Sequence, residues 1–282
     1  MTEILSSLKL LNKLNHLCLR RLIVINIVLN EKTLVEKILE TKELEGSIPY
    51  TATLLAKYYI HEKGLEPAQV YKIINEFLKE SCESYREAKW YSCIDEIIHK
   101  AKKYPLVEID SLPIYESEME IINGLENLRD QKILFTALCL AKYYNALNPQ
   151  NNNWVNTDYK DLFSLGNTVG TRERRCQIIG RLFRSDCITM SKKVNSLNFS
   201  VDILVDSGDV ALEITDFKNL GNRYLHFIGY PEISVCSCCG EPFRDISKKK
   251  KHRKGRLRQY CTSCKSEMQL NRYTKYYNSD KK

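Results

Sequence analysis

Four cysteines near the C-terminal end of the chain have the residue type and spacing of metal ligands. Cys236 and Cys239 form one Cys-x2-Cys pair, Cys261 and Cys264 form a second, and 21 residues separate the pairs. Four thiolates are the ligand set of a closed, tetrahedral zinc site. Because the protein would fill every position, no place is left for an activated water, so the spacing predicts a structural zinc ion. Iron, which also accepts tetrahedral sulfur, is the alternative metal.

The residue after the first pair indicates which of its cysteines bind. Gly240 follows Cys239 directly and allows the positive φ of a tight turn, so Cys239 is a better ligand than Cys238. Cys238 is then a spare thiol, with substitution as a ligand left open. Residues 236–264 resemble the zinc ribbons of many nucleic-acid-binding proteins. Metal binding should supply folding energy that this segment, poor in apolar residues, lacks otherwise.

A dense cluster of cations lies between the two cysteine pairs. The net charge of the chain is +8, and residues 228–282 contain 14 Lys and Arg but five Asp and Glu. Such a cluster predicts binding to nucleic-acid phosphates, of DNA or of RNA, whereas a merely solubilising tail is the alternative. Further on, Arg272 and Tyr273 begin a mix of cations and rings suited to phosphates and stacked bases. The clustered cations are Lys248, Lys249, Lys250, Lys251, Arg253, Lys254, Arg256 and Arg258.

A second cationic surface is predicted on a helix over residues 171–184. On a helical wheel its apolar side consists of Ile178, Ile179, Leu182 and Phe183, which should pack inward. The opposite side should face a ligand or solvent, and Arg172 could contact a phosphate from the helix start. The members of that opposite side are Arg174, Gln177, Arg181 and Arg184. Arginine can bond guanine and glutamine can bond adenine in the major groove, so this side is the candidate reading surface.

The elements around this helix have the order of a known DNA-binding family. Helices are expected over 131–146, 158–165 and 171–183, then a strand at 188–190 and a hairpin of 197–205 with 210–214 around Asp206-Ser-Gly-Asp209. Three helices followed by a strand and a hairpin resemble a winged helix. This resemblance implies that the third helix enters the major groove.

The first half of the chain shows a similar order with different side chains. Helices are expected over 50–61, 67–79 and 84–103, followed by a short strand at 106–109, and Leu-Ala-Lys-Tyr-Tyr occurs at 55–59 and again at 140–144. Duplication is therefore plausible, although the first copy lacks a clear wing. The predicted fold class is mainly α with small β hairpins (α+β). Its parts are an N-terminal helical segment (1–46), a first winged-helix-like module (47–115), a second winged-helix module (116–227) and a zinc ribbon with a basic tail (228–282).

Several classes of protein are excluded by what the chain lacks. Its longest apolar run, at 22–29, is far shorter than the roughly 20 residues of a membrane-spanning helix. No signal-peptide pattern follows it, so a cytoplasmic location with no membrane partner is expected. No phosphate-binding glycine motif of NTPases or dinucleotide enzymes occurs.

The resulting hypothesis is a non-catalytic DNA-binding protein. Tandem winged helices resemble the layout of phage and plasmid replication initiators, and the same parts suit a transcription regulator. One alternative is a magnesium-dependent, restriction-like nuclease that uses Asp202 and Glu213 on adjacent strands, although Thr215 occupies the position of the expected lysine. Another is an interaction factor that captures a host protein. A protein partner or a homo-oligomer is compatible with each of these.

Overall fold

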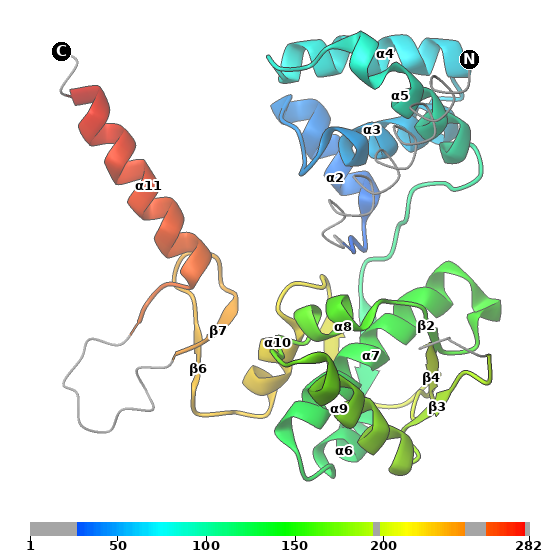
Figure 1. Cartoon of the computed structure of the whole chain (residues 1–282), viewed down its shortest axis with the longest axis vertical. Helices are drawn as coiled ribbons and strands as arrows, with labels where there is room; N and C mark the ends of the chain where they lie inside the picture. Colours follow the sequence, from blue (N-terminus) through cyan, green and yellow to red (C-terminus); the bar gives the residue numbers. More distant parts are fainter. Residues whose placement is uncertain (1–26, 194–197, 246–257, 280–282) are drawn as a thin grey trace, which may run out of the picture. The chain divides into compact units, whose positions relative to one another are not determined.

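The computed structural model describes residues 27–193, 198–245 and 258–279, with the backbone alone over 271–279. The chain divides into two compact units, residues 1–111 and 112–282 (Figure 1). The described residues form helices and small antiparallel sheets, so the expected mixed α and β class is confirmed. Residues 1–26 of the expected N-terminal segment lie outside the described residues.

The first unit is a group of helices around one apolar core. Its elements are α2 (Glu31–Thr41), α3 (Ile48–Lys57), a π-helical turn (Tyr58–Glu62), α4 (Pro67–Ser81) and α5 (Glu87–Ala101). The Asn30 side chain accepts from the Thr33 amide and caps α2, and Ser47 caps α3 in the same way. Leu54, Leu55 and Ile94 are fully buried, so the apolar side of each helix faces a shared core.

The strand expected at 106–109 is reduced to one bridge. Glu108 pairs with Asn30, and the Ile109 amide donates to the Leu29 carbonyl at 2.9 Å. The pairing stops there because α2 begins at Glu31 and carries the partner chain away. Within its described residues the first unit contains no β-hairpin.

The second unit is built around α7, a helix buried on nearly all sides. The helices of this unit are α6 (Glu116–Asn123), α7 (Leu128–Leu147), a 3-10 turn (Pro149–Asn151), α8 (Tyr159–Leu165), α9 (Arg172–Arg184), α10 (Leu220–Phe227) and α11 (Thr262–Ser279). Phe135, Leu138 and Leu140 of α7 are fully buried, as an all-round apolar helix requires. The helices expected over 131–146, 158–165 and 171–183 are therefore confirmed as α7, α8 and α9.

A three-stranded sheet completes this helical group. Its strands are β2 (Trp154–Val155), β3 (Ile188–Met190) and β4 (Phe199–Val201). All pairs are antiparallel and β4 is central, with Ser200 opposite both Trp154 and Thr189. The element order is thus helix, strand, two helices and a two-stranded hairpin whose last strand pairs with the first.

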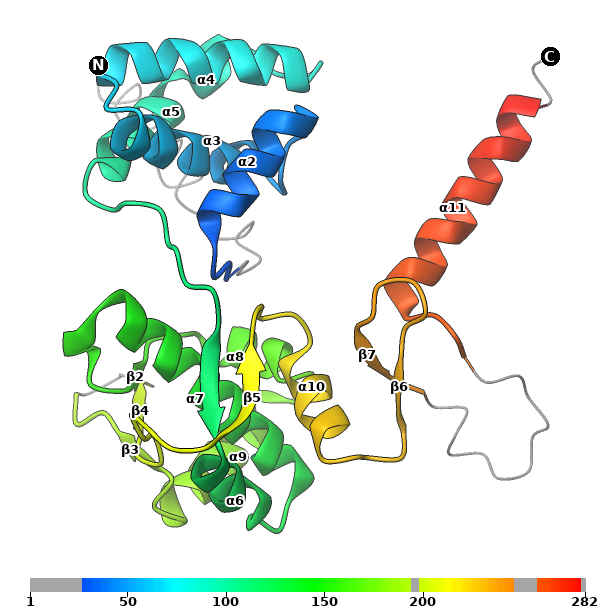
Figure 2. The same ribbon diagram turned by 180° about the vertical axis from the view of Figure 1, so that it is seen from behind.

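The prediction of a hairpin between 197–205 and 210–214 is wrong. Instead, β5 (Val210–Ile214) pairs with β1 (Leu112–Tyr115), a segment about a hundred residues earlier in the chain (Figure 2). Buried Glu118 explains the choice, since its carboxylate accepts from the amides of Tyr115 and Val205 at 2.8 and 3.0 Å. The bond from Val205 holds the chain before the 206–209 turn next to β1, and the Glu116 amide, which donates to the Asp209 carbonyl at 2.9 Å, holds the end of the turn there. The residues after the turn therefore pair with β1.

The C-terminal part is smaller and is connected through α10. Strands β6 (Ile233–Val235) and β7 (Pro242–Arg244) form a two-stranded antiparallel sheet, and α11 follows residues 246–257, which lie outside the described ranges. Phe243 packs with Cys236 and Cys264 in a small buried cluster. This core is much too small to hold the segment by apolar burial alone.

Candidate functional site

The first cysteine pair lies in the turn between β6 and β7. The Gly240 amide donates to the Cys236 carbonyl at 2.9 Å, and the Cys236 amide donates to the Glu241 carbonyl at 3.0 Å. Gly240 has φ +72°, the left-handed conformation that the sequence predicts at this position. The turn brings the side chains of Cys236 and Cys239 to one side.

The second pair lies at the start of α11. The Cys261 amide points at the first pair and donates to Cys236 Sγ at 3.3 Å, and the Cys264 amide donates to Cys261 Sγ at 3.5 Å. A further backbone bond joins Ser237 to the Gln259 carbonyl at 2.9 Å. Backbone amides aimed at sulfur are typical of the turns that hold thiolate ligands, because they stabilise the negative charge.

The four sulfur atoms form one compact group. All lie within 4.8 Å of one another, and Cys239 Sγ is 3.9 Å from Cys261 Sγ. Zinc bound to four sulfurs at about 2.3 Å requires sulfur separations of about 3.8 Å, so the residues fit a tetrahedral ion. In the part of the chain that the structure describes, no other cluster of three or more such ligands occurs. These cysteines therefore form a possible metal site.

The electrostatics of the group favour a bound cation. The amides of Cys239 and Cys261 lower the pKa of the Cys236 thiol to about 6, whereas the neighbouring sulfurs of Cys239 and Cys261 raise the pKa of Cys264. The Cys236 thiol thus ionises readily, whereas the sulfurs around Cys264 oppose a second negative charge on the Cys264 thiol. A divalent cation removes this conflict, because it compensates all four thiolate charges at once.

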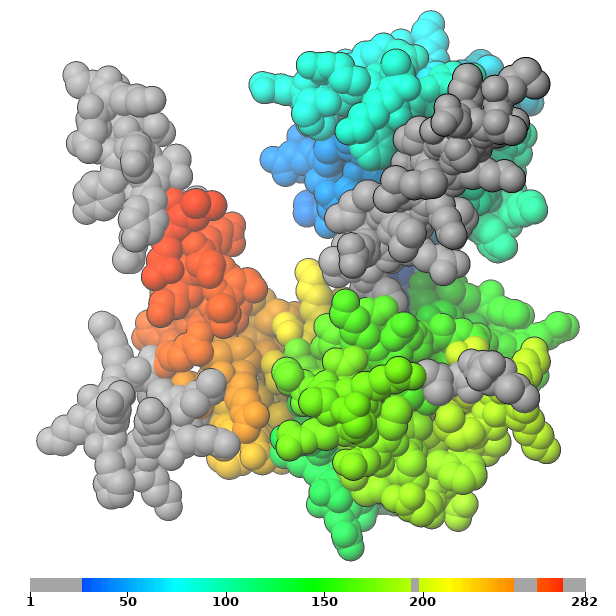
Figure 3. Space-filling view, viewed as in Figure 1, coloured from blue at the N-terminus to red at the C-terminus, as the bar shows by residue number. Residues whose placement is uncertain are grey.

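The predicted reading helix, α9, has one buried apolar side and one exposed polar side, as expected, except at Phe183. Ile178, Ile179 and Leu182 are buried, but Phe183, which was expected to pack inward, is 49% exposed because it lies at the last turn of α9. The outer side of α9 belongs to the surface of the second unit (Figure 3). Its exposed residues are Arg172, Arg174, Gln177 and Arg184.

Arg181 has a partner within the protein. Its Nε and one terminal nitrogen each donate to a carboxylate oxygen of Asp130 at 2.6 Å. Asp130 is 4% exposed and lies on α7, so this bidentate pair joins α9 to the central helix. The guanidinium is therefore engaged in holding α9, and the prediction that it also reads DNA stays a prediction.

Of the predicted basic segment, the structure describes only the last residue, Arg258. The predicted contacts Lys248, Lys249, Lys250, Lys251, Arg253, Lys254 and Arg256 lie outside the described residues. Arg258 lies over the Phe243 ring at 5.6 Å and donates to the Thr262 hydroxyl at 3.4 Å, so the segment ends against the metal site. Arg272 and Tyr273 lie on α11, a helix that the sequence analysis did not predict.

The acidic pair of the nuclease alternative is divided between β5, which contains Glu213, and the residue directly after β4, which belongs to another sheet. Asp202 follows β4 and accepts from the hydroxyls of Thr189 and Ser200 at 2.7 and 3.3 Å, while Glu213 lies on β5. The β4–β5 hairpin that was to place the two carboxylates on adjacent strands is not formed. The alternative thus loses the geometry on which it was based.

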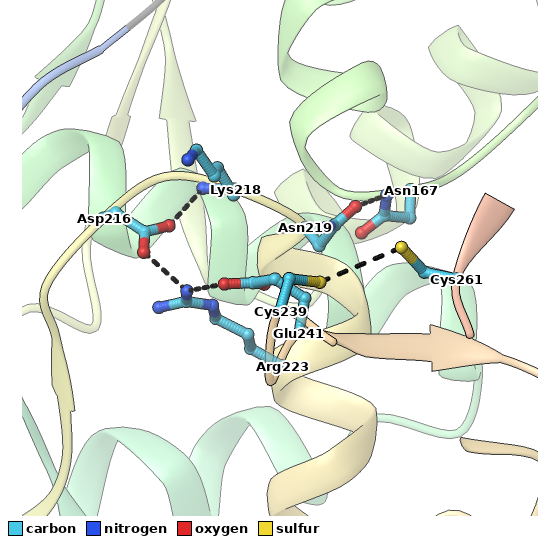
Figure 4. A network of polar contacts seen from close by, with 8 residues as sticks. All are labelled: Asn167, Asp216, Lys218, Asn219, Arg223, Cys239, Glu241 and Cys261. Carbon is cyan, nitrogen blue, oxygen red and sulfur yellow. Dashed lines mark hydrogen bonds and ion pairs between the residues drawn. The ribbon is translucent and has the colours of Figure 1, made fainter. Parts of the chain in front are cut away.

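No sequence pattern indicates the polar network that joins α10 to the possible metal site. Arg223 donates to Asp216 at 2.6 Å and to Glu241 at 2.7 Å, and Glu241 belongs to the turn that carries Cys236 and Cys239 (Figure 4). At the beginning of α10, Asn167 donates to Asn219 at 3.3 Å. These residues share no short-range spacing, so no motif could have indicated them.

No helix in the described ranges combines the length and the apolar character needed to cross a lipid bilayer.

Comparisons with known proteins leave the chain without a match. No protein-family model, no curated protein and no solved structure matches this chain. The functional conclusion therefore rests on the residues and geometry of the site.

Proposed function

We propose that the protein is a cytoplasmic, non-catalytic binder of duplex DNA. The observation that carries this proposal is the outer side of α9, on which Arg172, Arg174, Gln177 and Arg184 are all exposed along one helix. Two more exposed cations, Lys192 and Lys193, follow β3 in the adjacent hairpin. Long, donor-rich side chains on an exposed helix match the acceptors of the major groove and the flanking phosphates.

The arrangement of the elements supports a winged-helix assignment for the module around α7. The order α7, β2, α8, α9, β3, β4 with β4 central in the sheet is the order expected of that family. In this assignment α9 is the recognition helix and the β3–β4 hairpin is the wing. The wing is thus a different hairpin from the one that the sequence predicts.

The metal of the four-cysteine site is proposed to be zinc and structural. Four protein sulfurs and no open position favour this ion over a catalytic metal. When bound, zinc compensates the thiolate charges and holds together the β6–β7 turn and the start of α11, as in a zinc ribbon. The cations at 248–258 would then bind phosphates beside the groove contact made by α9.

The proposed role is replication initiation or transcription regulation. Both require a protein that selects a duplex site and acts by occupying it. Neither requires a catalytic centre.

The test is a titration of the full chain with a random duplex library at several salt concentrations. If about eight phosphates are neutralised, the log–log slope of affinity against salt should lie near −7. Arg174→Ala and Gln177→Ala should lower the affinity for selected sites by roughly 1–3 kcal/mol each. The control Lys37→Ala removes an exposed cation of the first unit and should change little. Negligible affinity for duplex at low salt would show that the proposal is wrong.

A further inference from the structure

Helix α10 lies between two parts of the proposed DNA-binding unit. Its first residues touch the turn that precedes α9, and a later residue reaches the turn that carries the first cysteine pair (Figure 4). The helix has eight residues, from Leu220 to Phe227, and Leu220, Tyr224 and Leu225 are buried against the rest of the unit. A short, well-packed helix of this kind transmits a displacement from one end to the other.

At the α9 end, backbone lies directly on backbone. A Cβ placed on Gly221 would lie 2.0 Å from the Gly166 carbonyl oxygen, so only glycine permits this approach. The Asn222 amide donates to the Asn167 side chain at 3.1 Å, and Lys132 Nζ donates to the Asn167 carbonyl at 2.7 Å. Residues 166 and 167, at the start of this turn, are therefore held by α10 and by Lys132 of α7.

At the metal end, α10 packs against β6 and β7, and the guanidinium of Arg223 makes the ion pairs of this contact. Arg223 bridges Asp216 and Glu241, and the side chains of Arg223 and Glu241 are 18% and 20% exposed. The Glu241 carbonyl accepts from the Cys236 amide, so Glu241 is part of the metal-binding turn. A half-buried ion pair with two carboxylates is costly to leave unpaired, and this gives the bridge its stiffness.

We infer that Arg223 is a positioning residue that couples metal occupancy of the four-cysteine site to the turn before α9. With metal bound, the cysteine turn is rigid, so Glu241 holds Arg223 and α10 holds residues 166–170. Without metal, nothing holds the four sulfurs together, the cysteine turn loosens, and Arg223 loses a fixed partner. The start of α9, where Arg172 and Arg174 lie, then loses its fixed position.

This coupling has a reciprocal consequence that rests on the proposed function. If metal increases the affinity for duplex DNA, then DNA must increase the affinity for the metal by the same factor. The metal site would therefore act in DNA binding through α10 as well as through its own cations. A ribbon tethered only by a flexible linker could not show such coupling through residues 166–170.

The experiment is amide hydrogen exchange on the full chain, with zinc bound and after removal of zinc by a chelator. In the wild type, metal removal should speed exchange of the amides at 166–168 and 222–223, by about 5- to 150-fold if the coupling is of ordinary size. Amides of α7 should keep their protection, which shows that the unit stays folded. In Arg223→Met, the amides at 166–168 should exchange fast with or without zinc.

Two further variants separate the bridge from simple loss of charge. Lys218→Met removes a neighbouring exposed cation whose side chain is outside the bridge, and it should respond to zinc like the wild type. Arg223→Lys keeps the charge and should retain part of the response. If the amides of α7 lose protection in Arg223→Met, that variant is partly unfolded, and Arg223→Lys is then used to test the coupling.

The outcomes for the coupling and for the proposed function are distinct. An unchanged exchange rate at 166–168 on metal removal from the wild type would overturn the coupling, as would an Arg223→Met response equal to that of the wild type. Absence of duplex binding by the wild type would overturn the proposed function while leaving the exchange result valid. If both hold, duplex DNA should slow zinc transfer to a chelator in the wild type and in Lys218→Met, and much less in Arg223→Met.

Discussion

Gly221 of α10 is packed so closely on Gly166 that a methyl group on Gly221 would overlap the Gly166 carbonyl. The ideal Cβ would lie 2.0 Å from that oxygen and 2.6 Å from Cε of Lys132. Both glycines are buried. The position of α10, and with it the connection to the metal site, therefore depends on the absence of a side chain at residue 221.

Gly221→Ala should destabilise the protein despite the higher helix propensity of alanine. Backbone atoms must move to accept the methyl group, which should lower the free energy of unfolding by about 1–3 kcal/mol or more. The matched control is Gly180→Ala in α9, where the nearest atom to the new Cβ is a side-chain nitrogen of Arg184 at 3.7 Å. That change should stabilise by about 0.5–1 kcal/mol. Urea unfolding of both variants measures the difference, and equal effects would contradict the packing argument.

Arg181→Met should lower the free energy of unfolding. It leaves the buried Asp130 carboxylate without its bidentate partner, and we expect a loss of about 2 kcal/mol, discounted from the value for a fully buried pair because the Arg181 side chain is 37% exposed. Arg184→Met, at the exposed end of the same helix, should change the free energy of unfolding by less than about 0.5 kcal/mol. Adding Asp130→Asn to Arg181→Met should recover part of the loss. If it recovers nothing in a double-mutant cycle, the pair does not hold α9 to α7.

Metal content should depend on Cys261 and be independent of Cys238. Cys261→Ser removes one of the four clustered sulfurs and should abolish or strongly reduce bound zinc, with a lower melting temperature of the C-terminal part. Cys238→Ser keeps all four and should retain one zinc per chain. Elemental analysis of the purified variants measures both. Equal loss of zinc from the two variants would show that the ligand set includes Cys238.

Lys132 should make stability rise with pH in the alkaline range. Burial, followed by the nearby charges of Arg244 and Arg129, lowers the pKa of Lys132 to about 8. Between that value and its pKa of about 10.4 in the unfolded chain, the unfolded state binds more protons, so the free energy of unfolding contributed by this group increases as pH rises. The gain should approach about 3 kcal/mol by pH 10.5.

The comparison with Lys132→Met isolates this contribution. The difference in unfolding free energy between wild type and Lys132→Met should grow in favour of the wild type from pH 7.5 to pH 10.5. Urea titrations at four or more pH values measure it. A difference that is constant with pH would mean that Lys132 titrates as it does in the unfolded chain.

Local patterns in the sequence were sufficient for α7, α8 and α9 and for the four cysteines of the possible metal site. The run of apolar residues in α7 and the apolar residues at helical spacing in α8 and α9 predict these helices, because such residues must be buried wherever the helix lies. The cysteine pairs are similarly local, since each pair lies within one turn and its spacing fixes how the two sulfurs point. Gly240 confirms this at a single residue, with the positive φ that the sequence predicts.

Only the tertiary structure decided which partners distant residues take. β5 pairs with β1 instead of its neighbour β4, Arg181 binds Asp130 across 51 positions, and Arg223 binds Glu241 in the cysteine turn. A strand edge or a guanidinium can satisfy its hydrogen bonds with many partners of the same chemistry. The choice among them follows from how α7 and α10 pack, and that packing is a property of the whole unit that no short stretch of sequence contains.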